Sequence, residues 1–156
     1  VNSFSKCWSM TGWRLGWIVA PAAFEAKLGQ LTEFNTSCTA GFVQEAGIAA
    51  LGDGEEEIAS LLSKIQAGYE ITTDRLNTFS RVEFIEPDGA FYCFFRVDGL
   101  TDSFAAAGEI LEQTKVGLAP GVAFGPQGEG YLRLCYAQPA DVLEEAFVRL
   151  EPFLSK

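Results

Sequence analysis

The stretch SFSKCWSMTGWRLG, residues 3–16, combines a lysine, an arginine and several serines with two tryptophans. Lys6 stands close to three tryptophans, Trp8, Trp13 and Trp17. A lysine that loses solvent among aromatic rings binds its proton less tightly and becomes nucleophilic. We therefore expect Lys6 to be a reactive amine, although a single lysine taken alone is more often a solvated surface charge.

Ser3, Ser5 and Arg14 add two hydroxyl groups and a planar guanidinium to the same stretch. These groups suit a phosphate dianion held beside a reactive lysine. Each of them alone is more simply interpreted as a turn residue or a surface ion-pair partner. Their grouping around Lys6 predicts a phosphate-binding site.

The residue order in this stretch resembles the pyridoxal phosphate attachment signature of class I aminotransferases, the aspartate aminotransferase-like group of fold type I. Small and apolar residues alternate before the lysine, and an arginine follows it by eight places, next to an apolar residue and a glycine. The resemblance implies pyridoxal 5'-phosphate as cofactor. It also implies that Lys6 is the internal-aldimine lysine and general base, that Ser3 and Arg14 bind the phosphate, and that Ser5 is a supporting hydroxyl.

Two later segments resemble the same family, PDGAFYCFF at 87–95 and PGVAFGPQGEGYLRLCYA at 120–137. The second implies that Arg133 binds the substrate α-carboxylate, for which a guanidinium fork has the matching geometry. Without this context Arg133 would be an arginine on the exposed face of a strand. For Phe91 and Phe124, packing in the core is at least as good an interpretation as contact with substrate.

The apolar pattern predicts an α/β fold. A strand is expected from Leu15 to Val19, and Asp53 is expected to cap a long helix that runs to about residue 79. The other expected helices span residues 22–34, 37–51, 103–114 and 139–154. The last expected strand spans residues 131–136.

The resemblance covers essentially the whole chain but only the carboxy-terminal portion of a family member, so we expect a carboxy-terminal fragment. It implies three parts. Residues 1–52 end the large cofactor-binding domain, residues 53–79 form a connecting helix, and residues 80–156 form a small α/β domain. A homodimer is implied as well.

Composition limits the other possibilities. The formal net charge of −10 repels nucleic acid and anionic membranes, and no apolar run approaches the roughly 20 residues of a spanning helix. The chain has no histidine, which excludes imidazole catalysis and imidazole metal sites within it. Its four cysteines lack CxxC spacing. We expect a cytoplasmic protein without a metal site and without a nucleic-acid or membrane partner.

The expected function is transfer of an amino group between an amino acid and a 2-oxo acid, with little activity in the isolated fragment. Two alternatives remain open at this point. A lyase of the β-elimination type would use the same lysine motif, because the motif does not fix the reaction. A non-catalytic interaction domain derived from such an enzyme would keep Ser3, Lys6, Arg14 and Arg133 without contacting the cofactor.

Overall fold

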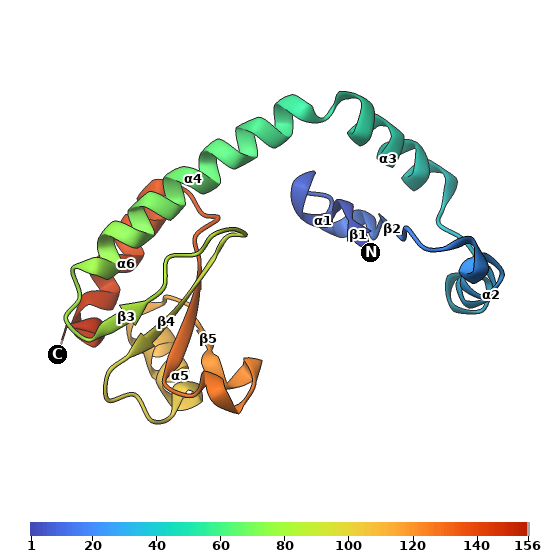
Figure 1. The fold of residues 1–156 in the computed structure, drawn as a ribbon. Helices are drawn as coiled ribbons and strands as arrows, with labels where there is room; N and C mark the ends of the chain where they lie inside the picture. The colour runs from blue at the N-terminus through green and yellow to red at the C-terminus, as the bar shows by residue number, and fades with distance from the viewer. Residues whose placement is uncertain (156) are drawn as a thin grey trace. The chain divides into compact units, whose positions relative to one another are not determined.

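A computed structural model describes residues 1–155 of the chain (Figure 1). The chain divides into two compact units, Val1–Leu62 and Ser63–Lys156, which we call the first and the second unit. Helices and strands occur in both units, so the predicted α/β class is confirmed.

The first unit contains a short hairpin and a series of helices. β1 (Asn2–Ser3) pairs antiparallel with β2 (Gly16–Trp17), with Ser3 opposite Gly16. The other elements of the first unit are α1 (Phe4–Cys7), η1 (Thr11–Trp13), η2 (Ala22–Phe24), α2 (Glu25–Thr36), α3 (Gly41–Asp53) and the start of α4 (Glu55–Asn77). The strand expected from Leu15 to Val19 is shorter than predicted, because β1 offers only two residues for it to pair with.

The junction of α3 and α4 differs from the prediction. Asp53 is the last residue of α3 and does not cap α4. The Gly54 carbonyl accepts a hydrogen bond from the Ile58 amide at 3.1 Å, while the Gly54 amide donates to the Ala50 carbonyl, also at 3.1 Å. A single residue, Gly54, therefore separates the two helices, and Asp53 has no free turn in which to act as the cap.

Few side chains in the first unit are buried. Phe4 is 4% exposed, and its ring centroid lies 4.9 Å from that of Trp8 and 5.0 Å from that of Trp17. Gly47 of α3 comes so close to this cluster that a β-carbon there would lie 2.6 Å from Leu15 Cδ2. No residue of α2 is buried. The aromatic cluster of Phe4, Trp8 and Trp17 is thus the main packing centre that supports the 3–16 stretch.

The second unit is built on a four-stranded antiparallel sheet in the order β3-β4-β6-β5. The strands are β3 (Val82–Phe84), β4 (Tyr92–Val97), β5 (Ala119–Pro120) and β6 (Tyr131–Cys135). The later helices are α5 (Ser103–Thr114) and α6 (Ala140–Leu154), and the short helical turns η3 (Gly121–Phe124) and η4 (Pro126–Gly128) lead into β6.

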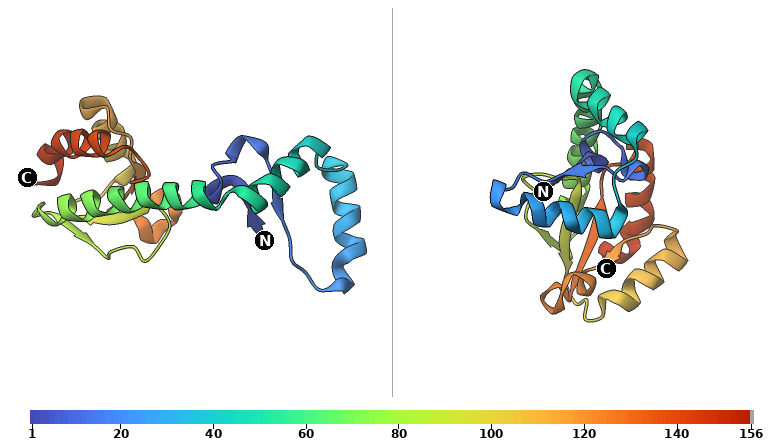
Figure 2. Two further views of the ribbon diagram at one scale, coloured as in Figure 1. Left: turned by 90° about the horizontal axis from the view of Figure 1, so that it is seen from above. Right: turned by 90° about the vertical axis from the view of Figure 1, so that its right-hand side faces the viewer.

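Helices α4, α5 and α6 contribute to one core with the inner face of this sheet, and α4 runs beside α6 (Figures 1 and 2). Alternate residues of β4 point into the core: Cys93, Phe95 and Val97 are buried. Burial raises the pKa of the Cys93 thiol to about 12. The intervening residues lie on the outer face, because successive side chains of a strand alternate.

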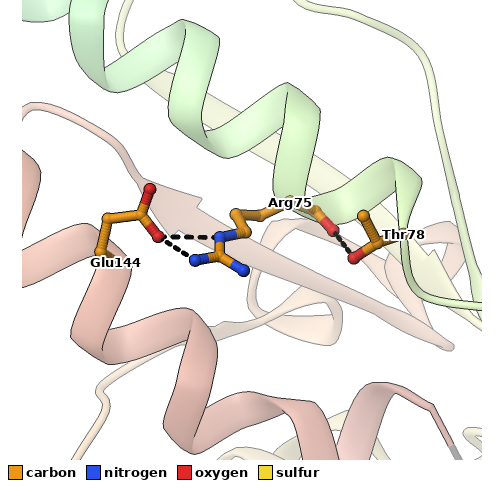
Figure 3. A network of polar contacts seen from close by, with 3 residues as sticks. All are labelled: Arg75, Thr78 and Glu144. Atoms are coloured by element: carbon orange, nitrogen blue, oxygen red, sulfur yellow. Dashed lines mark hydrogen bonds and ion pairs between the residues drawn. The ribbon is translucent and has the colours of Figure 1, made fainter.

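Specific contacts join α4 to α6 and to the sheet. Arg75 forms an ion pair with Glu144, to which its Nε donates at 2.8 Å, and the Arg75 carbonyl accepts from the Thr78 hydroxyl at 2.7 Å (Figure 3). A β-carbon on Gly68 would lie 2.1 Å from the Tyr136 carbonyl oxygen. Glycine is therefore required at position 68 for α4 to lie this close to the chain that follows β6. In residues 1–155, none of the helices combines the length and the apolar character that crossing a membrane requires.

Candidate active site

Ser3 and Ser5 are bonded to each other at the start of α1. The Ser3 hydroxyl accepts a hydrogen bond from the Ser5 amide at 3.0 Å and donates to the Ser5 hydroxyl at 2.8 Å. Ser3 is therefore the N-cap of α1, which explains why the helix begins at Phe4. The Phe4 amide donates to the Leu15 carbonyl at 3.1 Å and closes the hairpin.

Arg14 lies at the other end of the same hairpin. Arg14 precedes by two residues Gly16, which lies opposite Ser3 in the register of the hairpin. Arg14 has a left-handed backbone, with φ of 53°, which is uncommon for a residue other than glycine. Its Nη1 donates to the Thr11 carbonyl at 2.9 Å and its side chain is exposed. The hairpin thus carries hydroxyl groups at the start of α1 and a guanidinium just before β2, a donor set that suits a phosphate dianion.

Lys6 is exposed, contrary to the expectation that tryptophans would remove it from solvent. Trp8 follows the last residue of α1 and its ring packs on that of Phe4, four residues earlier, whereas Lys6 is two residues from each and does not share this face. Trp17 packs against the same Phe4 ring, and Trp13 is 45% exposed. The rings of Phe4, Trp8 and Trp17 pack against one another. They therefore do not remove Lys6 from solvent.

An open pocket of about 690 Å³ lies next to this hairpin in the first unit. Arg14, Gly16 and Trp17 form part of its wall, and the α2 residues Glu25 and Leu28 form another part. Lys6 and Ser3 do not line it. The pocket is therefore a feature of Arg14 and α2, separate from the turn that carries the lysine.

Arg133 lies in the second unit, in the middle of β6 and on the outer face of the sheet. Its strand neighbours Leu132 and Leu134 are buried on the opposite face. The guanidinium carbon lies 4.2 Å from the centroid of the Tyr92 ring and 4.4 Å from that of Phe124. Each contact is a cation–π interaction, worth about 0.5–1 kcal/mol at an exposed site. The Arg133 guanidinium therefore contacts two aromatic rings, one from β4 and one from η3.

The two rings were not singled out by the sequence as partners of Arg133. Tyr92 faces Cys135 across the sheet and is thereby a diagonal neighbour of Arg133, a relation that follows from strand register. Phe124 is 51% exposed, so core packing is the wrong interpretation for it. A signal for Tyr92 would have required the pairing of β4 with β6, which residue spacing alone does not give.

The loop that carries Phe124 is held by Ser103 and Glu129. Glu129 Oε1 accepts from the Ser103 amide at 2.6 Å and from the Gly130 amide at 2.9 Å. These hydrogen bonds hold the pKa of the Glu129 carboxyl below its usual range, and the one from the Gly130 amide has the largest effect. The Ser103 hydroxyl accepts from the Val122 amide at 3.2 Å.

Comparison with known proteins identifies the family. The model of the family "Aminotransferase class I and II" matches residues 1–150. An aspartate aminotransferase of Pyrococcus horikoshii is 38% identical over 98% of this chain and 40% of its own length. An aromatic-amino-acid aminotransferase of Thermococcus litoralis is 36% identical over 100% of this chain and 41% of its own length. The crystal structure of an aromatic aminotransferase from P. horikoshii superposes with a TM-score of 0.91 at 34% identity, over 98% of this chain and 41% of that one.

The chain belongs to the class I and II aminotransferase family. The resemblance seen in the 3–16 stretch is thereby confirmed at the level of the family, which uses pyridoxal phosphate. The chain spans about 40% of the length of the curated relatives that it matches. Four of the predicted site residues, Ser3, Ser5, Lys6 and Arg14, lie in the first unit, and Arg133 lies in the second.

Proposed function

We propose that this chain is the carboxy-terminal portion of a cytoplasmic, homodimeric aminotransferase that moves an amino group between an amino acid and a 2-oxo acid. The observation that carries the proposal is the 3–16 segment, in which Lys6 and the bonded hydroxyls of Ser3 and Ser5 lie at α1 and Arg14 lies just before β2. The family to which the chain belongs supports it.

In this proposal the first unit binds pyridoxal 5'-phosphate. Ser3, Ser5 and Arg14 hold the phosphate, because hydroxyl and guanidinium donors satisfy its oxygens and its charge. Lys6 is the residue to which the cofactor is attached. When bound, the cofactor supplies the electron sink that makes the substrate α-proton removable. Once the amino group of the substrate has replaced it on the cofactor, the Lys6 amine would take that proton and return one as general base and acid.

Arg133 binds the α-carboxylate of the substrate. Among residues 1–155 its guanidinium has ring contacts with Tyr92 and Phe124 and no hydrogen-bond or ion-pair partner. The N–H donors at its edge are therefore available to a carboxylate, which they pair with in bidentate geometry. The related enzymes are named for aspartate and for aromatic amino acids, and the proposal is accordingly limited to the reaction class.

Reductive trapping tests the lysine assignment. The 156-residue protein is titrated with pyridoxal phosphate, reduced with borohydride and mapped by peptide mass spectrometry. We expect saturable labelling at Lys6, loss of that label in Lys6→Ala, and no change at Lys6 in the matched control Lys27→Ala. Lys27 is an exposed lysine on α2 of the same unit.

Two outcomes would count against the proposal. Equal, non-saturable labelling of Lys6, Lys27 and Lys64 would contradict a cofactor site in the first unit and would favour the interaction-domain alternative. Saturable labelling of Lys6 that survives Ser3→Ala combined with Arg14→Ala would contradict the phosphate assignment and leave only a reactive lysine.

A further inference from the structure

We propose that Ser103 and Glu129 are positioning residues for Arg133: they fix both ends of the 121–130 loop, and the loop places the Phe124 ring on the guanidinium. This inference rests on the proposed function only where it concerns carboxylate binding. Its geometric part concerns the second unit alone.

Ser103 is the common anchor of the two loop ends. It is fully buried, at 0% exposed, at the start of α5. Its hydroxyl accepts from the Val122 amide, near the first end of the loop, and its amide donates to Glu129 Oε1, near the last. The same carboxylate oxygen accepts from the Gly130 amide. One serine and one carboxylate therefore close the loop.

Backbone contact makes the closed loop rigid. A β-carbon on Gly121 would lie 2.0 Å from the Gly128 carbonyl oxygen, and one on Gly128 would lie 2.1 Å from that of Gly121. Gly125 bridges the two turns, since its amide donates to Val122 and its carbonyl accepts from Gly128. Phe124 lies within this closed segment, so its main chain has little freedom as long as the ends stay attached.

The Phe124 ring then has two neighbours on the outer face of the sheet. It meets Phe94 edge to face, with centroids 5.8 Å apart, and it covers one face of Arg133. Phe94 is itself stacked on Tyr131 at 4.9 Å. Tyr92 contacts Arg133 from within β4, a strand that does not depend on the loop. Releasing the loop should therefore remove the Phe124 contact with Arg133 and keep the Tyr92 contact.

Nuclear magnetic resonance of the full 156-residue chain measures this directly. The Tyr92 and Phe124 rings close to the guanidinium shift the resonances of the Arg133 Nε–Hε and Cδ protons upfield. The difference between wild type and Phe124→Leu gives the part of this upfield shift that the Phe124 ring causes. We expect Glu129→Ala and Ser103→Ala to lose most of that part. Glu129→Gln should keep it, because an amide oxygen still accepts from both amides. Glu112→Ala, an exposed position on α5, is the matched control and should leave the shifts unchanged.

A merely stabilising role would give a different result. Glu129→Ala and Ser103→Ala would then lower the unfolding temperature but keep the wild-type Arg133 shifts in the folded state, which would overturn the proposal. Should one of the two variants fail to fold, the other decides the question, since each releases a different end of the loop.

A titration with phenylpyruvate connects this geometry to carboxylate binding. Binding is followed at the Arg133 Nε–Hε signal. We expect Phe124→Leu and Glu129→Ala to weaken it about two- to fivefold, the fold-change that corresponds to one exposed cation–π contact. Unchanged affinity in both variants would overturn the carboxylate part. No response in the wild type would contradict the proposed binding of the α-carboxylate by Arg133. The ring-induced chemical shifts would still decide whether Ser103 and Glu129 position the Phe124 ring.

Discussion

The two units hold their candidate site residues by different means. In the second unit, Phe95, Phe147 and Leu150 are at most 1% exposed and belong to a core shared by three helices and a sheet. In the first unit, α2 buries nothing and Phe34 is 89% exposed. Arg133 is thus placed by tertiary packing, whereas Lys6 is placed by one helical turn and a two-residue ladder. Hydrogen bonds between neighbours in sequence can arrange a reactive turn with little core beneath it.

Removing a core ring from the second unit should have the largest effect. Phe147 is 1% exposed and packs against the Phe79 ring, with centroids 6.2 Å apart. We expect Phe147→Ala to lower the free energy of unfolding by about 3–5 kcal/mol, measured by urea denaturation. Phe34→Ala in the first unit should change it by less than about 0.5 kcal/mol. A comparable cost at both positions would show that the contrast in burial between the units is wrong.

A methyl group on the contact face of α4 should have the next largest effect. Gly68→Ala would place a β-carbon against the Tyr136 carbonyl, and we expect it to cost about 1–3 kcal/mol because backbone must move. Gly108→Ala on α5 meets nothing within 4 Å and should instead stabilise by up to about 1 kcal/mol. Thermal unfolding of the two variants side by side tests this, and equal shifts would contradict the close approach at Gly68.

A change in the aromatic cluster should act on the first unit alone. Phe4→Ala removes the ring on which Trp8 and Trp17 pack, and we expect the Trp8 amide to exchange with solvent deuterium on the order of tenfold faster. The amide of Phe95 should keep its wild-type rate. Trp13→Ala is the control, since that ring is largely exposed. Faster exchange at Phe95 as well would mean that the units do not open independently.

Acid should weaken the loop closure at Glu129. The folded state lowers the pKa of this carboxyl, so its contribution to stability is complete above the pKa of the unfolded chain and is lost as pH falls through the lower, folded-state value. The free energy of unfolding of the wild type should therefore fall more between about pH 6 and pH 3 than that of Glu129→Gln does. This range spans the pKa of an ordinary glutamate, about 4.3. Unfolding temperatures across that range measure the difference, and parallel curves would contradict it.

Elements with strong local signals were predicted well. The helix expected at 103–114 is α5, with Asp102 as its N-cap, and the last expected helix and strand differ from α6 and β6 by one residue each. Apolar spacing and a capping residue suffice in such cases because the information is local. The junction at Asp53 was wrong because the sequence does not show that α3 continues through the expected loop.

The candidate site divides in the same way. Ser3, Lys6 and Arg14 could be grouped from spacing alone, since they lie within one hairpin. The surroundings of Arg133 could not, because Tyr92 reaches it across a strand pair and Phe124 from a loop whose ends meet at Ser103. Such contacts are set by sheet register, which depends on the whole core and not on the pattern within any one segment.

Alkylation of the buried Cys93 thiol reports on the opening of the second unit. Cys7 and Cys38 in the first unit are exposed, while Cys93 lies in the core of the second unit with its pKa raised to about 12. A thiolate, and not a thiol, attacks an alkylating reagent, so Cys93 can react only after the core opens. Iodoacetamide will alkylate the exposed Cys7 and Cys38 first and the half-buried Cys135 after them, and the slow alkylation of Cys93 will record how often the second unit opens.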